Sequence, residues 1–498
     1  RAAIDVAVER GSPDLVATLI ERGARPSQRK DTQGNSSLHL AVLRCRRAAA
    51  PASDGAPGGV PRRGSPPDPE AEAAAEAIAT QLISFEAEVN DQNRRGRTPL
   101  HLAAGLGCER LCALLLQAGA DPAATDRHNR SPAETALLAR QLGALTALVQ
   151  QPGVDINSLT KSGSTLLHLA AAEGDPELCL FCLSNCASVD AANPNGETPL
   201  HWAASLGHRA AAAALIEHGS SLAAQEKVRG FIPLHAACGP RGNEGTAALL
   251  LDAMQASGWQ GVPGGVDAKT RAGDTALLIA ARESPHADAL ARLLVAHGAS
   301  PAATNARGET VLHVLADRGD AALPEGSALL EMLGAQSLPL DARDSKGNTP
   351  LHTAAFAGNA PLALFLARRG ASLAAPNRDG LCPLDTAQVV QGRQLSRLLL
   401  RELPRPPDWV PDRTIGYCQV CKTPFGPTKD RPTAMPQRKH HCRHCGRCVC
   451  ATCSPGRASL RKFGAPPGAA PERVCLECEH VLGGQGAGGG RGYSPALG

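Results

Sequence analysis

Eight cysteines in the C-terminal part of the chain are spaced as four Cys-x-x-Cys pairs. These pairs are Cys418 with Cys421, Cys442 with Cys445, Cys450 with Cys453, and Cys475 with Cys478. A closed structural zinc site takes four ligands in tetrahedral geometry, so eight thiolates predict two sites. A short segment with few large apolar side chains needs such metal crosslinks to fold. Two neighbours of the pairs, Cys448 and His444, are surplus to this count, and we expect neither to bind metal.

The same segment is basic. Residues 405–481 carry 13 Lys and Arg against 6 Asp and Glu, a net charge of +7, whereas the whole chain has a net charge of only +4. The stretch RKHHCRHCG at 438–446 concentrates cationic groups around one cysteine pair. Converging guanidinium and ammonium groups are suited to phosphate, so we expect an anionic ligand here.

Several kinds of two-zinc module could account for these residues. A RING domain, typical of ubiquitin ligases, places a histidine closer to the next cysteine pair than His444 stands to Cys450, with five residues between them. A nucleic-acid-binding zinc ribbon would use aromatic stacking residues, which are scarce in this chain, and would leave the His440-His441 pair unexplained. Both fit poorly, and the ubiquitin ligase is kept as the alternative function.

Three separate motifs resemble the FYVE domain, whose ligand is phosphatidylinositol 3-phosphate. They are Trp409-Val410-Pro411-Asp412, the stretch from Arg438 to Gly446, and Arg473-Val474-Cys475. The resemblance implies that the headgroup pocket is lined by Arg438, Lys439, His440, His441, Arg443 and Arg473. It also implies that Asp412 accepts hydrogen bonds from inositol hydroxyls, with Trp409 packing beneath as structural support.

The pairing of the cysteines is likewise implied by the resemblance. In this arrangement the ligands are interleaved: Cys418, Cys421, Cys450 and Cys453 hold one Zn²⁺, and Cys442, Cys445, Cys475 and Cys478 hold the other. One feature departs from the family. Twenty residues separate Cys421 from Cys442, and the stretch 425–437 carries charges and prolines rather than a short apolar loop. We therefore expect weak insertion into the bilayer.

A repeated phrase organises the residues before 400. TPLHLAA at 98–104 recurs as TPLHWAA, IPLHAAC and TPLHTAA, with weaker copies, at a period near 33 residues. A turn residue precedes each copy: Gly34, Gly96, Asn129, Gly163, Gly196, Gly230, Gly273, Gly308, Gly347 and Gly380. Each copy predicts a helix capped by Thr or Ser with Pro in its first turn. The pattern resembles the ankyrin repeat, with about ten repeats and a partial first one.

Chemically reactive residues inside this array have a structural explanation. In ankyrin repeats the histidine ties neighbouring turns together, which assigns that role to His101, His168, His201, His235, His313 and His352. Five cysteines are expected to be small apolar residues on helix faces: Cys108, Cys112, Cys179, Cys182 and Cys186. The array offers no cluster of acids, bases or nucleophiles, so we predict no catalytic residues and no enzymatic activity.

The sequence thus predicts a mostly α-helical chain: an ankyrin-repeat solenoid over 1–400, a two-zinc FYVE-type domain over 401–482, and a disordered Gly-rich tail over 483–498. A Pro-, Gly- and Arg-rich insertion near 44–72 is expected to be disordered. The chain begins at Arg1 within a repeat-like pattern and lacks a long apolar segment, so we expect a fragment of a longer protein that meets membranes from the surface.

The combination resembles the endosomal proteins of the rabankyrin type. It implies an adaptor in the cytosol and on the cytoplasmic face of early endosomes, active in endocytosis and vesicle trafficking. The FYVE domain would bind phosphatidylinositol 3-phosphate membranes, and the repeats would recruit protein partners, in particular a GTP-bound endosomal Rab GTPase. No nucleic-acid partner is expected, and homodimerisation is left open.

Overall fold

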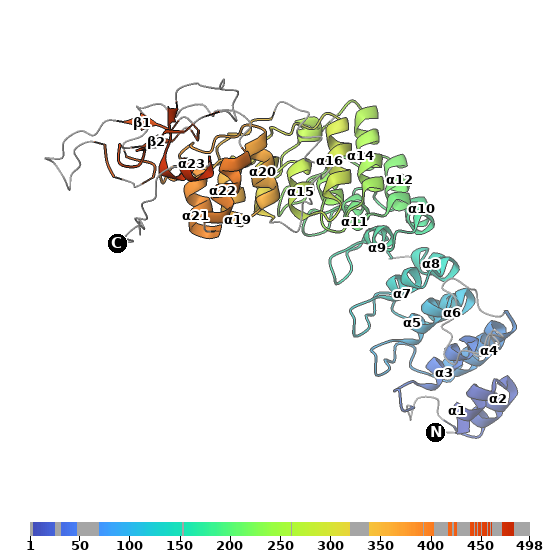
Figure 1. Ribbon diagram of the computed structural model, residues 1–498. Helices are drawn as coiled ribbons and strands as arrows, with labels where there is room; N and C mark the ends of the chain where they lie inside the picture. The colour runs from blue at the N-terminus through green and yellow to red at the C-terminus, as the bar shows by residue number, and fades with distance from the viewer. Residues whose placement is uncertain are drawn as a thin grey trace, which may run out of the picture. The chain divides into compact units, whose positions relative to one another are not determined.

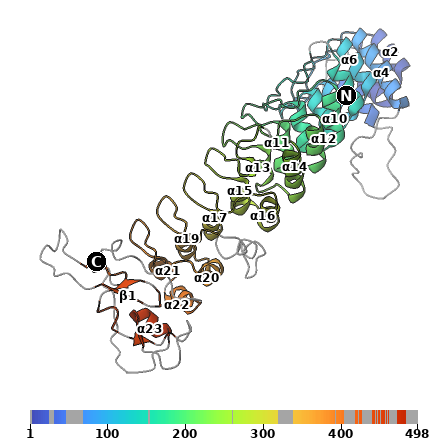
Figure 2. The ribbon, with the colours of Figure 1, turned by 90° about the horizontal axis from the view of Figure 1, so that it is seen from above.

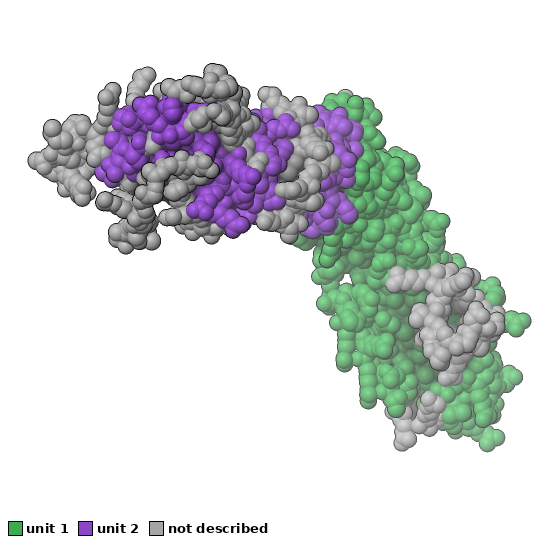
Figure 3. All heavy atoms as spheres, in the orientation of Figure 1, with its two compact units in different colours: residues 1–237, 241–261 green, residues 238–240, 262–498 purple. Residues whose placement is uncertain are grey.

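The computed structural model describes residues 3–24, 31–46, 69–151, 154–259, 261–318, 338–391, 393–402 and short stretches between 417 and 482. The chain divides into two compact units, coloured separately in Figure 3. The first comprises residues 1–237 and 241–261, and the second comprises residues 238–240 and 262–498. The Gly-rich tail at 483–498 lies outside the described residues.

The first unit consists of helices that follow one another in pairs (Figure 1). They are α1 (Ala3–Arg10), α2 (Pro13–Glu21), α3 (Ser37–Leu43), α4 (Pro69–Ser84), α5 (Pro99–Leu106), α6 (Glu109–Gln117), α7 (Pro132–Leu138), α8 (Leu142–Val149), α9 (Leu166–Glu173), α10 (Pro176–Ser184), α11 (Pro199–Leu206), α12 (Arg209–Glu217), α13 (Pro233–Ala237) and α14 (Glu244–Ala256). Each odd-numbered helix from α1 to α13 contacts the next in that series. The second helices contact one another from α2 to α8 and again from α10 to α14, which gives a layered stack of helix pairs.

The second unit repeats this pattern (Figure 2). Among the described residues, its repeat helices are α15 (Ala276–Glu283), α16 (Ala287–Ala296), α17 (Val311–Asp317), α19 (Pro350–Ala357), α20 (Ala360–Arg368), α21 (Pro383–Gln391) and α22 (Arg393–Glu402), preceded by the 3-10 helix η2 (Gly265–Asp267). Helices α15, α17, α19 and α21 contact each other in series, and α20 contacts α22 beside them. The mostly α-helical repeat architecture predicted from the sequence is confirmed.

Local interactions explain why the first helix of each repeat begins where it does. In α5, Thr98 is the N-cap, Pro99 is the first helical residue, and the Thr98 backbone N–H donates to Nδ1 of His101 at 3.2 Å. Because Nδ1 accepts, the ring proton lies on Nε2, which donates to the carbonyl oxygen of Arg130 in the next repeat at 2.9 Å. The same pair of bonds is made by His39, His168, His201, His313 and His352. The structural role predicted for His101, His168, His201, His313 and His352 is confirmed, and His39 has the same role although it was not predicted. For His235 the first of the two bonds is seen, because its Nδ1 accepts from the Ile232 N–H at 3.1 Å.

The turn residues predicted from the repeat period all have left-handed backbone conformations. Their φ angles are positive at all ten positions, including 60° at Asn129. At Gly96, with φ 73°, an added Cβ would lie 2.8 Å from the backbone nitrogen of Arg127, which donates to the Arg95 carbonyl at 3.0 Å. Glycine is therefore required at Gly96 both by its backbone angle and by the close packing of adjacent hairpins.

Two expectations need correction. The insertion near 44–72 is shorter than predicted, because Arg44–Arg46 form the 3-10 helix η1 and α4 begins at Pro69. Alanine and glutamate favour helix there, with proline at the first position; residues 47–68 lie outside the described part. Cys186 does not sit on an apolar helix face: it is exposed, with φ 64°, in the turn after α10 where other repeats have glycine.

The zinc-finger region of the second unit contains only short regular elements among its described residues. Strand β1 (His440–His441) pairs antiparallel with β2 (Cys448–Val449), and β3 (Arg457–Ala458) pairs antiparallel with β4 (Glu472–Arg473). Helix α23 (Leu476–Val481) begins directly after its N-cap residue Cys475. No helix among the described residues of the chain is long and apolar enough to cross a membrane.

Candidate zinc and lipid-headgroup site

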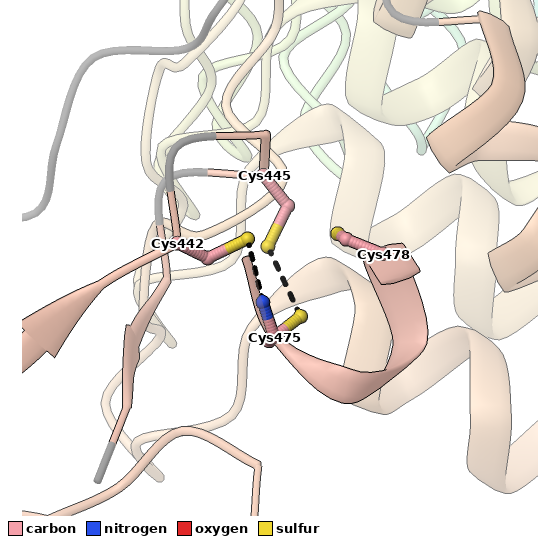
Figure 4. Close-up of side chains that lie close together, drawn as sticks. All are labelled: Cys442, Cys445, Cys475 and Cys478. Atoms are coloured by element: carbon pink, nitrogen blue, oxygen red, sulfur yellow. Dashed lines mark hydrogen bonds between the residues drawn. The ribbon is translucent and has the colours of Figure 1, made fainter. Parts of the chain in front are cut away.

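Four buried cysteines converge in the second unit. The Sγ atoms of Cys442, Cys445, Cys475 and Cys478 all lie within 4.8 Å of one another. Cys442 and Cys445 come from the turn that follows β1, and Cys475 and Cys478 come from the start of α23, so the four side chains point to a common centre (Figure 4). Within the described part of the chain, this is the only such group of three or more potential metal ligands.

The donors around these thiols fit a metal-thiolate centre. Nε of Arg447 donates to Sγ of Cys445 at 3.3 Å, and its Nη2 donates to Sγ of Cys475 at 3.5 Å. The backbone N–H of Cys475 donates to Sγ of Cys442 at 3.2 Å. Hydrogen bonding from Cys445 lowers the pKa of Cys442, whereas burial raises the pKa of Cys478. Four sulfur ligands with guanidinium and amide donors suit a tetrahedral zinc ion, which keeps its coordinating thiols deprotonated.

The Cys179–Cys182 pair in the repeats does not have the features of a metal site. Burial raises the pKa of both Cys179 and Cys182 to about 12. Their Cys-x-x-Cys spacing places both thiols on one helix, α10, without a second pair facing them among the described residues. These thiols behave as apolar packing groups, as predicted.

Half of the other predicted ligand set can be located. Cys418 is fully buried and Cys453 is 6% exposed. Cys421 and Cys450 lie outside the described residues. The assignment of these four cysteines to one zinc ion stays a prediction.

The predicted headgroup residues are distributed over two strand pairs. Lys439, His440 and His441 are half-buried and consecutive at β1, and the Lys439 ammonium lies 5.5 Å from the centre of the Phe425 ring. Arg473 lies on β4, in the other strand pair, and its Nη1 donates to the carbonyl oxygen of Ser454 at 3.1 Å. The remaining predicted residues, Asp412, Arg438, Arg443 and the supporting Trp409, lie outside the described part.

Sequence reasoning missed two residues that hold this region together. Arg447 is 1% exposed although it is charged, and its contacts with two cluster cysteines explain its burial. Gln419 is fully buried and exchanges two hydrogen bonds with the backbone of Cys448. The only sequence signal was position: Arg447 directly follows the Cys442–Gly446 motif, and Gln419 lies inside the first Cys-x-x-Cys pair.

Comparison with known families agrees with this geometry. The profile of the FYVE zinc finger matches residues 408–483, which include the cysteine cluster. The profile described as ankyrin repeats (3 copies) matches residues 71–160, 134–226, 167–260 and 277–377. Together these matches cover both parts of the chain that the repeats and the cysteine spacing had distinguished.

Individual proteins with related sequences share about a third of their residues or fewer with this chain over the aligned regions. Rabankyrin-5 of Homo sapiens is 28% identical over 434 residues, which are 79% of this chain and 34% of the relative. Neurogenic locus notch homolog protein 1 of Homo sapiens is 32% identical over 153 residues, 30% of this chain and 6% of the relative. The crystal structure of the ankyrin repeat domain of Bcl-3 aligns with a TM-score of 0.39 at 20% identity, over 47% of this chain and 93% of that one. The chain thus spans about a third of Rabankyrin-5.

Proposed function

The chain belongs to the ankyrin-repeat family, in the rabankyrin-type combination with a C-terminal FYVE zinc finger, and from this premise we propose that it is a non-catalytic endosomal adaptor. In this function the zinc finger binds phosphatidylinositol 3-phosphate and the repeats recruit trafficking proteins. The FYVE match at 408–483 carries the proposal, because it coincides with the buried thiol cluster and the basic strand β1. The proposed domains remain 1–400, 401–482 and the tail 483–498.

Zinc binding is supported by the FYVE family match and the cysteine cluster. We propose two zinc ions per chain, one for each set of four cysteines. A metal bound by Cys442, Cys445, Cys475 and Cys478 would crosslink the turn after β1 to the start of α23. The second ion would be held by the set that contains Cys418 and Cys453. These crosslinks would fix the short strands that carry the headgroup residues.

The residues around β1 supply the charge for lipid recognition. Lys439, His440 and His441 are only half-buried, so part of each residue is accessible from solution. A phosphorylated inositol headgroup would be held by these residues with Arg438, Arg443 and Arg473, while Asp412 would accept from sugar hydroxyls. Arginine can contact two phosphate oxygens at once, which favours a phosphate at a fixed ring position over diffuse membrane charge.

Liposome sedimentation of the whole chain tests the lipid function. Vesicles containing phosphatidylinositol 3-phosphate should bind the protein, and vesicles of equal charge made with phosphatidylserine should bind it far less. Equal binding to both would contradict headgroup recognition. Autoubiquitination by the purified chain with an E1 and a panel of E2 enzymes would instead support the ubiquitin-ligase alternative.

The array is proposed to recruit a GTP-bound endosomal Rab GTPase. Ankyrin arrays present hairpins and helix faces as extended binding surfaces. In the first unit the hairpins between α3 and α7 border a hollow of about 640 Å³, whose lining includes Asn93, Arg95, Arg97 and Arg130. Pull-down of GTP-loaded and GDP-loaded Rab proteins by the whole chain tests this recruitment. Equal binding of the GTP-loaded and GDP-loaded forms would contradict it.

A further inference from the structure

The zinc finger contacts the last ankyrin repeat through a buried glutamine. Nε2 of Gln419 donates to the carbonyl oxygen of Ala374 at 2.9 Å, in the segment after α20. Oε1 of Gln419 accepts from the backbone N–H of Cys448 at 2.7 Å, and its own backbone N–H donates to the Cys448 carbonyl at 2.9 Å. The amide nitrogen and the amide oxygen of this side chain thus each make a hydrogen bond, one to the repeat and one to β2, and the residue is fully buried.

The register of the β1–β2 pair explains why Cys448 can bind Gln419. His441 is the residue opposite Cys448, and the flanking position is bonded because the Cys442 N–H donates to the Arg447 carbonyl at 2.9 Å. In an antiparallel pair, alternate residues direct their N–H and C=O groups away from the partner strand. Cys448 is such a residue. Gln419 therefore bonds to the edge of β2 that faces away from β1, while β1 pairs with the opposite edge.

Two further contacts join the same parts of the second unit. The hydroxyl of Tyr417 donates to the carbonyl oxygen of Gly380, in the last hairpin of the array. An added Cβ at Gly380 would collide with that hydroxyl. Helix α23, which carries Cys478, contacts α22, the last helix of the array, and the two lie side by side in Figures 1 and 2.

An identical stretch in another repeat shows what this contact covers. Ser-Leu-Ala-Ala occurs at 221–224 and again at 372–375, in each case just after the second helix of a repeat. Leu222 and Ala223 are half-buried, whereas Leu373 and Ala374 are fully buried. Since the local sequence is the same, the extra burial comes from tertiary packing. The end of a repeat array needs a cap that separates its apolar core from water, and terminal repeats with a polar outer face normally provide it.

We propose that the zinc finger is the C-terminal cap of the ankyrin array, and that metal binding at Cys442, Cys445, Cys475 and Cys478 stabilises the last repeat through Gln419 and α23. The route is short, because Cys448 follows Cys445 by three residues and α23 starts between two of the ligands. The proposal uses the zinc binding expected of the family but does not depend on lipid recognition. It implies that the stability of the last repeat depends on whether zinc is bound to the finger.

Hydrogen–deuterium exchange of the whole chain tests the coupling. Zinc removal with a chelator should accelerate exchange across 371–402 by about tenfold or more, since a covered terminal element would then open locally. The matched stretch 220–224 with α12 should not change, and returning zinc should restore protection. Metal analysis of the same samples reports occupancy. Unchanged exchange in 371–402 after zinc has left would overturn the proposal, as would equal deprotection of both regions or the absence of zinc from the untreated chain.

A substitution separates the contact from the metal site. Gln419→Glu keeps the acceptor for Cys448 but replaces the donor to Ala374 with a carboxylate, so exchange in 371–402 should be fast with or without zinc. If zinc binding stabilises the closed repeat, the closed repeat must stabilise bound zinc by the same free energy. The variant should therefore bind zinc more weakly, by the factor that zinc contributes to protection of 371–402 in the unaltered chain. Gln225→Glu adds the same charge at an exposed position beside the matched stretch and should change neither quantity.

Tyr417→Phe is a milder second variant, in case Gln419→Glu prevents folding. It removes only the hydroxyl that donates to Gly380, and should reduce the zinc-dependent protection of 371–402 without removing zinc. Protection equal to that of the unaltered chain in both variants would contradict the role assigned to this interface. Neither result bears on lipid binding, so failure of this proposal is distinguishable from failure of the adaptor function.

Discussion

The imidazole of His352 joins two consecutive repeats, because its Nε2 donates to the carbonyl oxygen of Leu381 at 3.0 Å while its Nδ1 accepts from the N–H of its own N-cap, Thr349. Only the neutral ring can do both at once. Burial lowers the pKa of His352 to about 4, from 6.5. Burial also lowers the pKa values of His101, His168, His201 and His313.

We expect the array to lose stability on acidification. With a folded-state pKa below the unfolded value, the unfolded chain binds more protons, so the contribution of His352 is complete above pH 6.5 and is lost as pH falls toward about 4. For His352 this amounts to on the order of 3 kcal/mol. Urea unfolding followed by circular dichroism between pH 7 and pH 4 measures it. His352→Gln should reduce the pH dependence, and an unchanged dependence would contradict the assignment.

Glu134 occupies the histidine position of its repeat in α7, with its N–H donating to Oγ of the N-cap Ser131 at 3.2 Å. Burial raises the pKa of this carboxyl, so its charge opposes folding at neutral pH and ceases to do so once acid protonates it. Glu134→Gln should therefore raise the unfolding midpoint at pH 7, and the gain should shrink toward pH 4. Glu134→Ala removes the carboxyl that interacts with the backbone of the N-cap residue Ser131, and should lower stability by about 1 kcal/mol. A destabilised Gln variant at pH 7 would refute this account.

Removing one cluster cysteine should remove one zinc ion. Cys475→Ser deletes a ligand that lies among three other thiols, so metal analysis should fall from about two zinc ions per chain to about one. The folding of the zinc finger should then depend on the remaining site. Cys182→Ser replaces a buried thiol in α10 and is the matched control. Identical zinc content in all three proteins would exclude the cluster as a metal site.

Arg443 is the residue whose loss should most weaken lipid binding. Charged hydrogen bonds to phosphate contribute about 1.5–3 kcal/mol, so Arg443→Ala should weaken binding to phosphatidylinositol 3-phosphate vesicles by about 10- to 100-fold. Arg110→Ala removes the same charge from an exposed position in α6, a helix of the repeats, and should have little effect. Equal losses in the two variants, measured by surface plasmon resonance on immobilised vesicles, would indicate nonspecific attraction.

Membrane residence is expected to depend on salt. The stretch 425–437 contains Lys429, Asp430 and Arg431, whose desolvation opposes insertion into the bilayer. Raising the salt concentration should therefore weaken vesicle binding by the monomeric chain, and fusion to a dimerising helix should restore it through avidity. Deletion of Lys429–Gln437 is the control and should leave affinity unchanged. Tight, salt-insensitive binding that the deletion abolishes would show that this loop inserts.

Much of the array could be predicted from the sequence because its structure is set by local interactions. The N-cap residue, the proline and the histidine of TPLH lie within one turn of helix. Gly96 adopts its positive φ angle without help from distant residues, because glycine has no Cβ. Even the departures keep this chemistry: where Asp385 replaces histidine, its carboxylate accepts from the Cys382 N–H at 3.0 Å. Sequence expectation failed at Cys186, because the turn that ends α10 places a cysteine in a left-handed conformation usually given to glycine.

The sequence by itself predicted that the four Cys-x-x-Cys pairs between Cys418 and Cys478 bind metal, because eight thiols in one short segment can supply two closed sites. Which pairs meet is a different matter: Cys445 and Cys475 are 30 residues apart, and only resemblance to a family, not spacing, suggested their pairing. The tertiary structure alone decided that Arg447 is buried against these sulfurs and that Gln419 reaches Ala374, 45 residues away. Such contacts depend on how separately folded elements pack, and no local pattern encodes that packing.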